Sequence, residues 1–458
     1  MSIIGYNHNR KTRRPGWQDY QKRLNRSRQS RKGRKWIPAL VACVALVLLF
    51  YLGWTSQSAA TAPLPEAIAV FSPSQSQRLS QKDVQLLLSH ARIEDLNSRR
   101  IQVRLGQQQF DLHTSLDMDL QDHLLAAMDR RNSRYIAVVA MDPNSGRILS
   151  LAGFNKSDPG INPCTDNHFP AASIFKIVTA AAAVDVCGLK PDAKLDFNGD
   201  KYTLYKSQLK DRHNRYTSSM SFRDSFAQSV NPVFGKLGMG RLKKPILEQY
   251  GEAFGFNQSI GFELPMLPSR LEVKDIPYNW AEIACGFNND TTLSPVHAAA
   301  MVSAVVNQGE MILPTVVDRM VDAHGTVLYQ AQRQRYGRVM TEAASQTLAQ
   351  LMAATVRSGT ARKAFRHQSS DRVLSALTVG GKTGSISNQA HDVRFDWFVG
   401  FAQQKKGPDK LVVAVLVGHE DYIGTRAATY ARMAISYYFG NHLARLNGHD
   451  RSIKNDDS

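Results

Sequence analysis

Hydrophobic residues recur along the chain with two different periods, which predict two kinds of element. Apolar residues spaced for one face of a helix predict helices over residues 81–97, 120–128, 173–180, 296–306, 342–357 and 427–443. Alternating or β-branched runs predict strands over residues 101–105, 135–141, 147–153, 377–383, 397–402 and 411–418. The sequence Asp-Pro-Asn-Ser-Gly at 142–146 is typical of a tight turn and predicts that its flanking strands form a hairpin.

The order of these elements predicts an α+β fold. Strands from both ends of the domain are expected to form an antiparallel sheet of about five strands flanked by helices. Residues 190–350 are expected to be mainly helical with irregular joins, and to form a large helical subdomain inserted between the strands.

A basic N-terminal segment runs directly into an uncharged apolar segment. The net charge is +18, and twelve basic residues against one acid in residues 1–35 account for +11 of it. Residues 36–54 carry no charge, have aromatic residues near their ends and have the length of a transmembrane helix. The positive residues would keep the N-terminus in the cytoplasm, so the remaining chain would be exported.

This pattern predicts a single-pass protein of the inner (cytoplasmic) membrane with a periplasmic or otherwise extracytoplasmic body. A cleaved signal peptide, with a small-residue site at 60–62, is the alternative. Nucleic-acid binding by the basic tail is not needed to explain its charge, and no nucleic-acid partner is expected. The expected organisation is a tail (1–35), an anchor (36–54), a spacer and short N-terminal stub (55–109), one large domain (110–445) and a polar tail (446–458).

Three of the four cysteines lie beyond the membrane segment. Exported chains meet an oxidising compartment, so Cys164 and Cys187 could form a disulfide that braces the intervening helix. The alternative is three unpaired, mostly buried thiols. The cysteine and histidine spacings do not resemble a zinc site, and no metal is expected.

The candidate nucleophile is Ser173, at the start of an apolar, Ala-rich helix. Lys176 lies three residues further on, so both side chains share one helix face. A neutral lysine could take the serine proton, and the free N–H groups of a first helical turn favour developing negative charge. Ser207 and Lys210 have the same Ser-x-x-Lys spacing, so this pattern alone does not identify a site.

Two later motifs could complete the site. Ser229 and Asn231 lie at a predicted helix–helix junction, although Asn231 could simply cap the helix that begins at Pro232. Lys382-Thr383-Gly384-Ser385 ends an apolar strand, where small residues let a substrate backbone approach. A nucleotide P-loop is excluded, because Ala376 occupies the position that the motif requires to be glycine.

The ordered trio Ser-x-x-Lys, Ser-x-Asn and Lys-Thr-Gly resembles the penicillin-binding protein transpeptidase domain, a serine acyl-transferase family related to β-lactamases. The resemblance covers about residues 110–445 and includes the flanking sequences 114–117, 137–153, 358–361 and 396–400. Ser385 stands where threonine is commoner, which preserves the hydroxyl. The spacer is too short for a glycan-polymerising domain and short for a pedestal domain, so recruitment of cell-wall synthesis partners by such modules is not assumed.

The resemblance implies a D,D-transpeptidase that needs no cofactor. Ser173 would attack the D-Ala-D-Ala carbonyl of a peptidoglycan stem peptide, with Lys176 as its base. Ser229 would pass the proton to the leaving D-Ala, and Asn231 would hold the peptide amide. Lys382 would raise the local positive potential, Thr383 and Ser385 would bind the terminal carboxylate, and Gly384 would belong to the same substrate-binding segment. The N–H groups of Ser173 and Ser385 would form the oxyanion hole. β-Lactams would acylate Ser173.

Three alternatives share these motifs. A D,D-carboxypeptidase would use water where a transpeptidase uses an amine. A class A β-lactamase would need a glutamate-centred loop, and the candidate sequence around Glu263 does not resemble it. A non-catalytic β-lactam sensor or scaffold would not require the intact trio, and a sensor would need a cytoplasmic signalling module that the 35-residue tail does not resemble.

Overall fold

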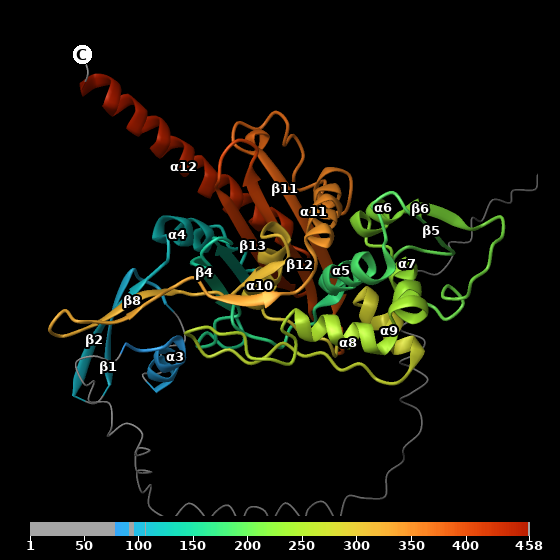
Figure 1. Ribbon diagram of the computed structural model, residues 1–458, viewed down its shortest axis with the longest axis horizontal. Coiled ribbons are helices and arrows are strands. Elements are labelled where there is room, and N and C mark those ends of the chain that lie inside the picture. The colour runs from blue at the N-terminus through green and yellow to red at the C-terminus, as the bar shows by residue number, and fades with distance from the viewer. Residues whose placement is uncertain (1–77, 91–95, 106, 457–458) are drawn as a thin grey trace, which may run out of the picture. The chain divides into compact units, whose positions relative to one another are not determined.

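The computed structural model of the chain describes residues 78–90, 96–105 and 107–456, which belong to one compact unit (Figure 1). None of the helices in these ranges is both long and apolar enough to cross a membrane. The predicted basic tail (1–35) and membrane anchor (36–54) lie outside the described residues, as do residues 55–77, 91–95 and 106 of the predicted spacer and stub.

A five-stranded antiparallel sheet lies at the centre of the structure and confirms the α+β prediction. The strand order is β11-β12-β13-β3-β4, so strands from the two ends of the domain lie side by side. The five strands are β3 (Ser133–Met141), β4 (Ile148–Asn155), β11 (Leu377–Ser387), β12 (Arg394–Gln404) and β13 (Lys410–His419). The junction between the two halves is the β13–β3 pair, in which Val412 lies opposite Met141.

Helices cover both faces of this sheet (Figure 1). The helices are α3 (Gln81–His90), α4 (Met118–Ala126), α5 (Lys176–Cys187), α6 (Phe222–Ala227), α7 (Asn231–Lys236), α8 (Lys243–Ala253), α9 (Pro277–Cys285), α10 (Pro295–Val306), α11 (Glu342–Arg357) and α12 (Ala427–Asp456). Helices α4 and α12 lie on one face, while α10 lies on the other, with α5 and α11 beside the β11 edge.

Alternate residues of the sheet belong to two separate cores. In β3, Ala137 and Val139 join the core that contains α5 and α10, whereas Val138 and Ala140 join the core that contains α4 and α12. Strands buried on both faces read as continuous apolar runs rather than as alternating ones. This explains why the runs at 135–141 and 411–418 were recognisable as strands without a polar face.

The prediction that residues 190–350 are mainly helical is wrong for part of that range. Six short strands lie there: β5 (Lys194–Phe197), β6 (Ser218–Ser221), β7 (Glu310–Ile312), β8 (Val317–Asp322), β9 (Val327–Gln330) and β10 (Arg335–Arg338). Strands β8 and β9 extend a sheet of order β1-β2-β8-β9 with β1 (Arg100–Leu105) and β2 (Gln108–Thr114). Strands this short carry little periodicity, so the sequence pattern does not identify them.

The structure adds detail at the two ends of the predicted domain. Residue 110, its expected start, lies inside β2, so the preceding stub joins the β1-β2-β8-β9 sheet. The segment 446–456, expected to be a polar tail, continues α12, and no proline interrupts it. No disulfide joins Cys164 to Cys187 or Cys285 among the described residues, so the bracing bridge is not formed.

Candidate active site

Ser173 and Lys176 lie together where a tight helical turn continues into α5. Ser173 is in a 3₁₀ turn, Ala172–Phe175, and α5 begins at Lys176. The three-residue spacing places Lys176 Nζ 2.8 Å from Ser173 Oγ. Ser173 is partly exposed and the Lys176 side chain is fully buried, so solvent reaches the hydroxyl but not the amine.

Two contacts that the sequence did not suggest hold this turn in place. The buried Trp397 of β12 donates a hydrogen bond from Nε1 to the carbonyl oxygen of Pro170, at 2.9 Å. Gly286 follows α9 with φ 69°, and a Cβ there would lie 1.8 Å from the carbonyl oxygen of Ala172. The left-handed backbone and the close approach both require glycine. A glycine directly after an apolar helix is the usual C-terminal signal, and it could have identified this position.

Lys176 Nζ donates three hydrogen bonds, and none of its partners among the described residues is a carboxylate. Besides Ser173 Oγ, it contacts Asn231 Oδ1 at 2.8 Å and the Cys285 carbonyl oxygen at 2.6 Å. Three donated bonds satisfy an ammonium group completely. Burial lowers the pKa of Lys176 to about 8, because a charged amine loses its hydration in the interior.

These contacts determine what happens when Lys176 loses a proton. The neutral amine keeps two N–H groups and gains a lone pair. The oxygens of Asn231 and Cys285 can only accept, so they retain the two N–H groups. The Ser173 hydroxyl can turn and donate to the lone pair, and the arrangement therefore suits transfer of the serine proton to Lys176.

Ser229 lies between α6 and α7 and contacts the candidate nucleophile directly. Its backbone is left-handed, with φ 57°, which is uncommon for serine and aims the side chain at the turn. Ser229 Oγ donates to Ser173 Oγ at 3.0 Å. Lys382 Nζ in turn donates to Ser229 Oγ at 3.0 Å.

Asn231 is a contact of Lys176 rather than a helix cap. Its Nδ2 donates to the Tyr202 carbonyl oxygen at 3.0 Å, while Oδ1 accepts from Lys176. Helix α7 starts at Asn231 itself, and the capping position, Val230, has no side-chain hydrogen bond. The capping alternative is therefore wrong.

The third motif lies in β11, the edge strand of the central sheet. Lys382 is fully buried, and its pKa is lowered well below the usual value by burial and then by the charge of Lys176. Lys382 Nζ also contacts the Thr383 carbonyl oxygen at 2.9 Å. At Gly384 an added Cβ would lie 3.3 Å from the backbone nitrogen of Ser173, so the strand runs directly beside the turn.

Two neighbours of this motif were not assigned from the sequence. Thr360 shares a hydrogen bond between its hydroxyl and that of Thr383. Arg394 donates from Nε to Ser385 Oγ at 3.1 Å. Both hydroxyls of the motif thus have fixed positions. Thr360 lies in one of the flanking sequences that resemble the family, and this was its only signal in the sequence. Arg394 had no such signal, because the pairing of β11 with β12 brings it beside Ser385.

Two other candidates lie away from this cluster. Ser207 and Lys210 are exposed in a turn and make no side-chain contact with it among the described residues. Glu263 is fully buried, and its carboxylate accepts hydrogen bonds from Gln81, Thr315, Tyr329 and the backbone of Val316. A carboxylate engaged in this way does not activate water beside Ser173.

Comparison with known proteins decides the family. The profile described as "Penicillin binding protein transpeptidase domain" matches residues 136–436. This chain belongs to that family. The match covers all but the first three residues of the central sheet and all three motifs of the cluster.

Two curated relatives of the penicillin-binding transpeptidase family illustrate the likeness. Stage V sporulation protein D of Bacillus subtilis is 28% identical over 305 residues, which are 60% of this chain and 44% of that protein. The peptidoglycan D,D-transpeptidase FtsI homolog of Mesostigma viride is 22% identical over 320 residues, 61% of this chain and 51% of that protein. The chain thus spans about half the length of these relatives.

Solved structures support the fold. The D,D-transpeptidase domain of a peptidoglycan glycosyltransferase from Eggerthella lenta aligns with a TM-score of 0.59 at 21% identity, covering 72% of this chain and 83% of that one. Penicillin-binding protein A from M. tuberculosis, solved as an imipenem acyl-enzyme complex, aligns with a TM-score of 0.57 at 21% identity, covering 71% and 79%.

Proposed function

We propose that this protein is a D,D-transpeptidase that cross-links peptidoglycan stem peptides through an acyl-enzyme on Ser173 and is inhibited by β-lactams. The observation that carries the proposal is an unbroken line of side-chain hydrogen bonds. It runs from Lys382 Nζ to Ser229 Oγ, to Ser173 Oγ and to Lys176 Nζ. Family membership and the names of the relatives support the same activity.

In the acylation step, neutral Lys176 takes the hydroxyl proton while Ser173 Oγ bonds to the carbonyl carbon of the penultimate D-Ala. The oxyanion that forms would accept from the N–H groups of Ser173 and Ser385, where losing one donor typically costs about 100- to 1000-fold in rate. The carbon–nitrogen bond then breaks, and the leaving D-Ala amine receives a proton through Ser229. The hydrogen bonds of Ser229 to Ser173 and Lys382 support this role.

The charge of the site favours an anionic substrate. Lys176 and Lys382 are both buried, and neither bonds to a carboxylate within the described part of the chain. A terminal carboxylate bound at Thr383 and Ser385 would compensate this uncompensated positive charge. Asn231 would hold the peptide amide. An amine of a second stem peptide then attacks the ester, releasing Ser173 and forming the cross-link.

We also propose that residues 36–54 anchor the protein in the cytoplasmic membrane, with residues 1–35 in the cytoplasm and the catalytic domain exported. The length and charge asymmetry of the N-terminal sequence support this placement. Cell-wall synthesis proteins at the same membrane are the proposed partners. A protease-protection experiment on membrane vesicles tests this topology: an accessible catalytic domain on the cytoplasmic side would overturn it.

Covalent labelling tests the site. The full-length protein in detergent should be labelled by a fluorescent penicillin, and Ser173→Ala should abolish the label. Ser207→Ala is the matched control, because Ser207 belongs to the second Ser-x-x-Lys sequence, and it should leave labelling unchanged. The reverse pattern would refute the assignment.

Product analysis tests the reaction. The full-length protein is incubated with a stem-peptide donor and an amine acceptor. Cross-linked peptide supports the proposal, whereas free D-Ala without cross-linking would indicate a D,D-carboxypeptidase. Rapid turnover of penicillin would indicate a β-lactamase. Neither of the last two results is compatible with the proposed function.

A further inference from the structure

A second basic site lies at the opposite end of the strand that carries Lys382. It is a pocket of about 540 Å³ between the end of α11, the start of β11 and the segment that joins them. Five of its lining residues are basic: Arg357, Arg362, Arg366, His367 and Lys405. No acidic side chain lines it. This composition favours a negatively charged ligand.

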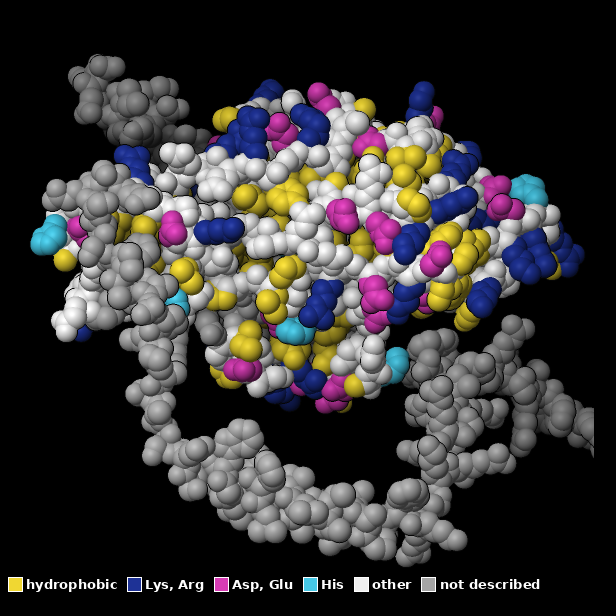
Figure 2. Space-filling view, turned by 60° about the horizontal axis from the view of Figure 1, so that its bottom comes forward, with side chains coloured by type: hydrophobic (Ala, Val, Ile, Leu, Met, Phe, Trp, Pro, Cys, Tyr) yellow, Lys and Arg dark blue, Asp and Glu magenta, His cyan; other side chains and the backbone are white. Residues whose placement is uncertain are grey.

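The three arginines are available to a ligand. The side chains of Arg357, Arg362 and Arg366 are exposed and form no hydrogen bond or ion pair with any residue that the structure describes. Some arginines elsewhere are paired with acids: Arg147 pairs with Asp318, and Arg432 with Asp371, the acid nearest in sequence to the pocket. On the face of the domain drawn in Figure 2, basic and acidic side chains are interspersed. The acid-free lining is therefore a local feature, and not only a consequence of the basic composition.

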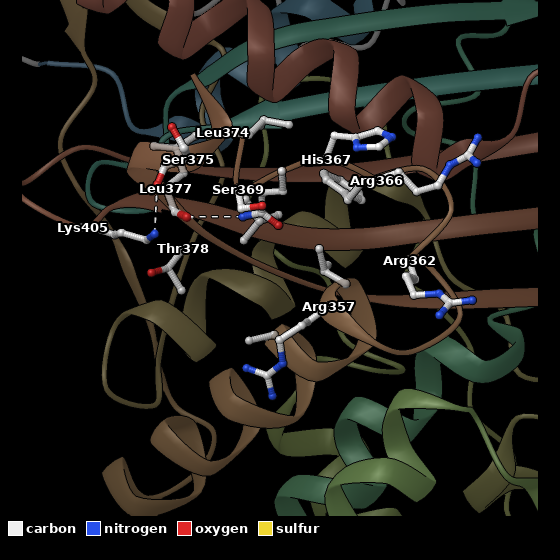
Figure 3. A pocket seen from close by; sticks show the side chains of 15 residues that line it. Arg357, Arg362, Arg366, His367, Ser369, Leu374, Ser375, Leu377, Thr378 and Lys405 are labelled. Carbon is white, nitrogen blue, oxygen red and sulfur yellow. Dashed lines mark hydrogen bonds between the residues drawn. The ribbon is translucent and has the colours of Figure 1, made fainter. Parts of the chain in front are cut away.

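The cations surround the pocket instead of converging on one point. Figure 3 shows Arg357 on one side, Arg362 and Arg366 on another, and Lys405 across the opening from them. Lys405 is fixed by donating to the Ser375 carbonyl oxygen at 2.9 Å. Guanidinium groups bind carboxylates through paired hydrogen bonds. Because the groups are spread, the arrangement suits an extended ligand with several carboxylates better than one compact anion.

The pocket is also lined by buried apolar side chains, which form its floor. Its buried hydrophobic residues are Val356, Phe365, Leu374, Leu377 and Val379. Floors of this kind give a ligand backbone a surface to pack on while a few polar groups fix its orientation. The volume is within the range of sites that hold a short peptide or a drug-sized molecule.

The position of the pocket connects it with the reaction. Thr378 lines it, and Lys382 lies further along the same strand, about 14 Å away at about 3.4 Å per residue. Arg357 ends α11, and the segment that follows brings Thr360 onto Thr383. One molecule of peptidoglycan could thus contact both places.

We propose that this pocket binds the carboxylate-bearing stem peptide of a neighbouring peptidoglycan segment while another stem peptide occupies the Ser173 site. The identity of the occupant rests on the proposed function; the preference for a multiply charged carboxylate ligand rests on the pocket alone. The three free arginines bind the carboxylates, and the apolar floor supports the peptide backbone.

Binding of a labelled stem tripeptide tests this proposal. The tripeptide lacks the terminal D-Ala-D-Ala, keeps its free carboxylates and is titrated into the full-length protein in detergent, with fluorescence anisotropy as the readout. Arg362→Gln combined with Arg366→Gln should weaken binding about tenfold or more. The matched control is Lys363→Gln combined with Arg372→Gln, which removes the same charge from exposed neighbours that do not line the pocket, and it should change binding less than about twofold.

Further measurements separate the possible outcomes. Protein acylated by penicillin should bind the tripeptide as well as free protein does, and all variants should be acylated at the same rate, which also shows that they fold. Three results would each overturn the proposal. The first is an amidated tripeptide that binds as well as the free acid, the second is an equal loss of binding in both double variants, and the third is loss of binding when the protein is acylated. Glycerol phosphate, a lipid headgroup, bound in place of the tripeptide would assign the pocket to membrane lipid. A protein that binds the tripeptide at these arginines but is not acylated would refute the proposed function, while the proposal that the pocket binds a carboxylate ligand would still hold.

Discussion

The pKa of Lys176 predicts how acylation of Ser173 depends on pH. Burial lowers this pKa from 10.5 to about 8, and only the neutral amine can accept the serine proton. The acylation rate constant should therefore fall about tenfold for each pH unit below about 8 and become constant above it. At pH 7 about one tenth of Lys176 is neutral, about 300-fold more than for an amine with the unshifted pKa of 10.5.

The assay is the time course of labelling by a fluorescent penicillin between about pH 6 and 9, with the full-length protein in detergent. Titration of Lys176 would not destabilise the fold below pH 8, so it would not slow acylation by unfolding the protein. Its pKa is lower in the folded than in the unfolded state, so it makes stability rise with pH only between about 8 and 10.5. Below pH 8 both states are protonated, and Lys176 contributes no pH dependence to the free energy of unfolding.

Substitution gives the complementary result. Lys176→Arg keeps a cation but cannot provide a base, because a guanidinium remains protonated, so the rate at pH 8 and above should fall by about 100- to 10,000-fold. Lys210→Ala, in the second Ser-x-x-Lys sequence, should leave rate and pH profile unchanged. A flat profile between pH 6 and 8, or a profile rising towards 10.5, would refute the assignment of Lys176 as the base.

Three further changes test the support of the site. Gly286→Ala places a Cβ against the Ser173 turn and strains a left-handed residue, so acylation should slow at least about tenfold. Gly240→Ala changes an open position and should leave the acylation rate unchanged. Equal rates in the two variants would contradict the steric argument. Trp397→Phe leaves the Pro170 carbonyl oxygen without its donor, at a cost of about 1–3 kcal/mol, and should lower Tm by several degrees in calorimetry. Burial raises the pKa of Glu263, so the free energy of unfolding should fall as pH rises from the unfolded-state pKa of 4.5 through the folded-state pKa. Glu263→Gln should remove this component of the pH dependence in urea titrations. An unchanged profile would show that other groups cause it.

The sequence predicted the central sheet because its strands are long and unmistakably apolar. Strands β3 and β13 are buried on both faces, so their runs were evident without knowledge of their partners. The short strands β7 to β10 were missed for the opposite reason. Each has few buried residues and is stabilised by pairing with segments that the sequence pattern does not identify.

The candidate site shows the same division. The residue types of Ser173, Lys176, Ser229, Asn231 and Lys382 were readable because their chemistry requires specific side chains. The backbone atoms that complete the site carry no side-chain signal. The Cys285 carbonyl oxygen contacts Lys176 only because a left-handed glycine turns the chain after α9.

By itself the sequence determined which groups could react and in which elements they lie, since local spacing fixes helix faces and strand ends. Only the tertiary structure decided that Ser173 and not Ser207 has a buried lysine, a second serine and a second lysine around it. It also decided how readily that buried lysine loses its proton. A lysine in an exposed turn such as Lys210 keeps its water, whereas packing of α5, α7 and α9 around Lys176 removes that water and lowers its pKa to about 8.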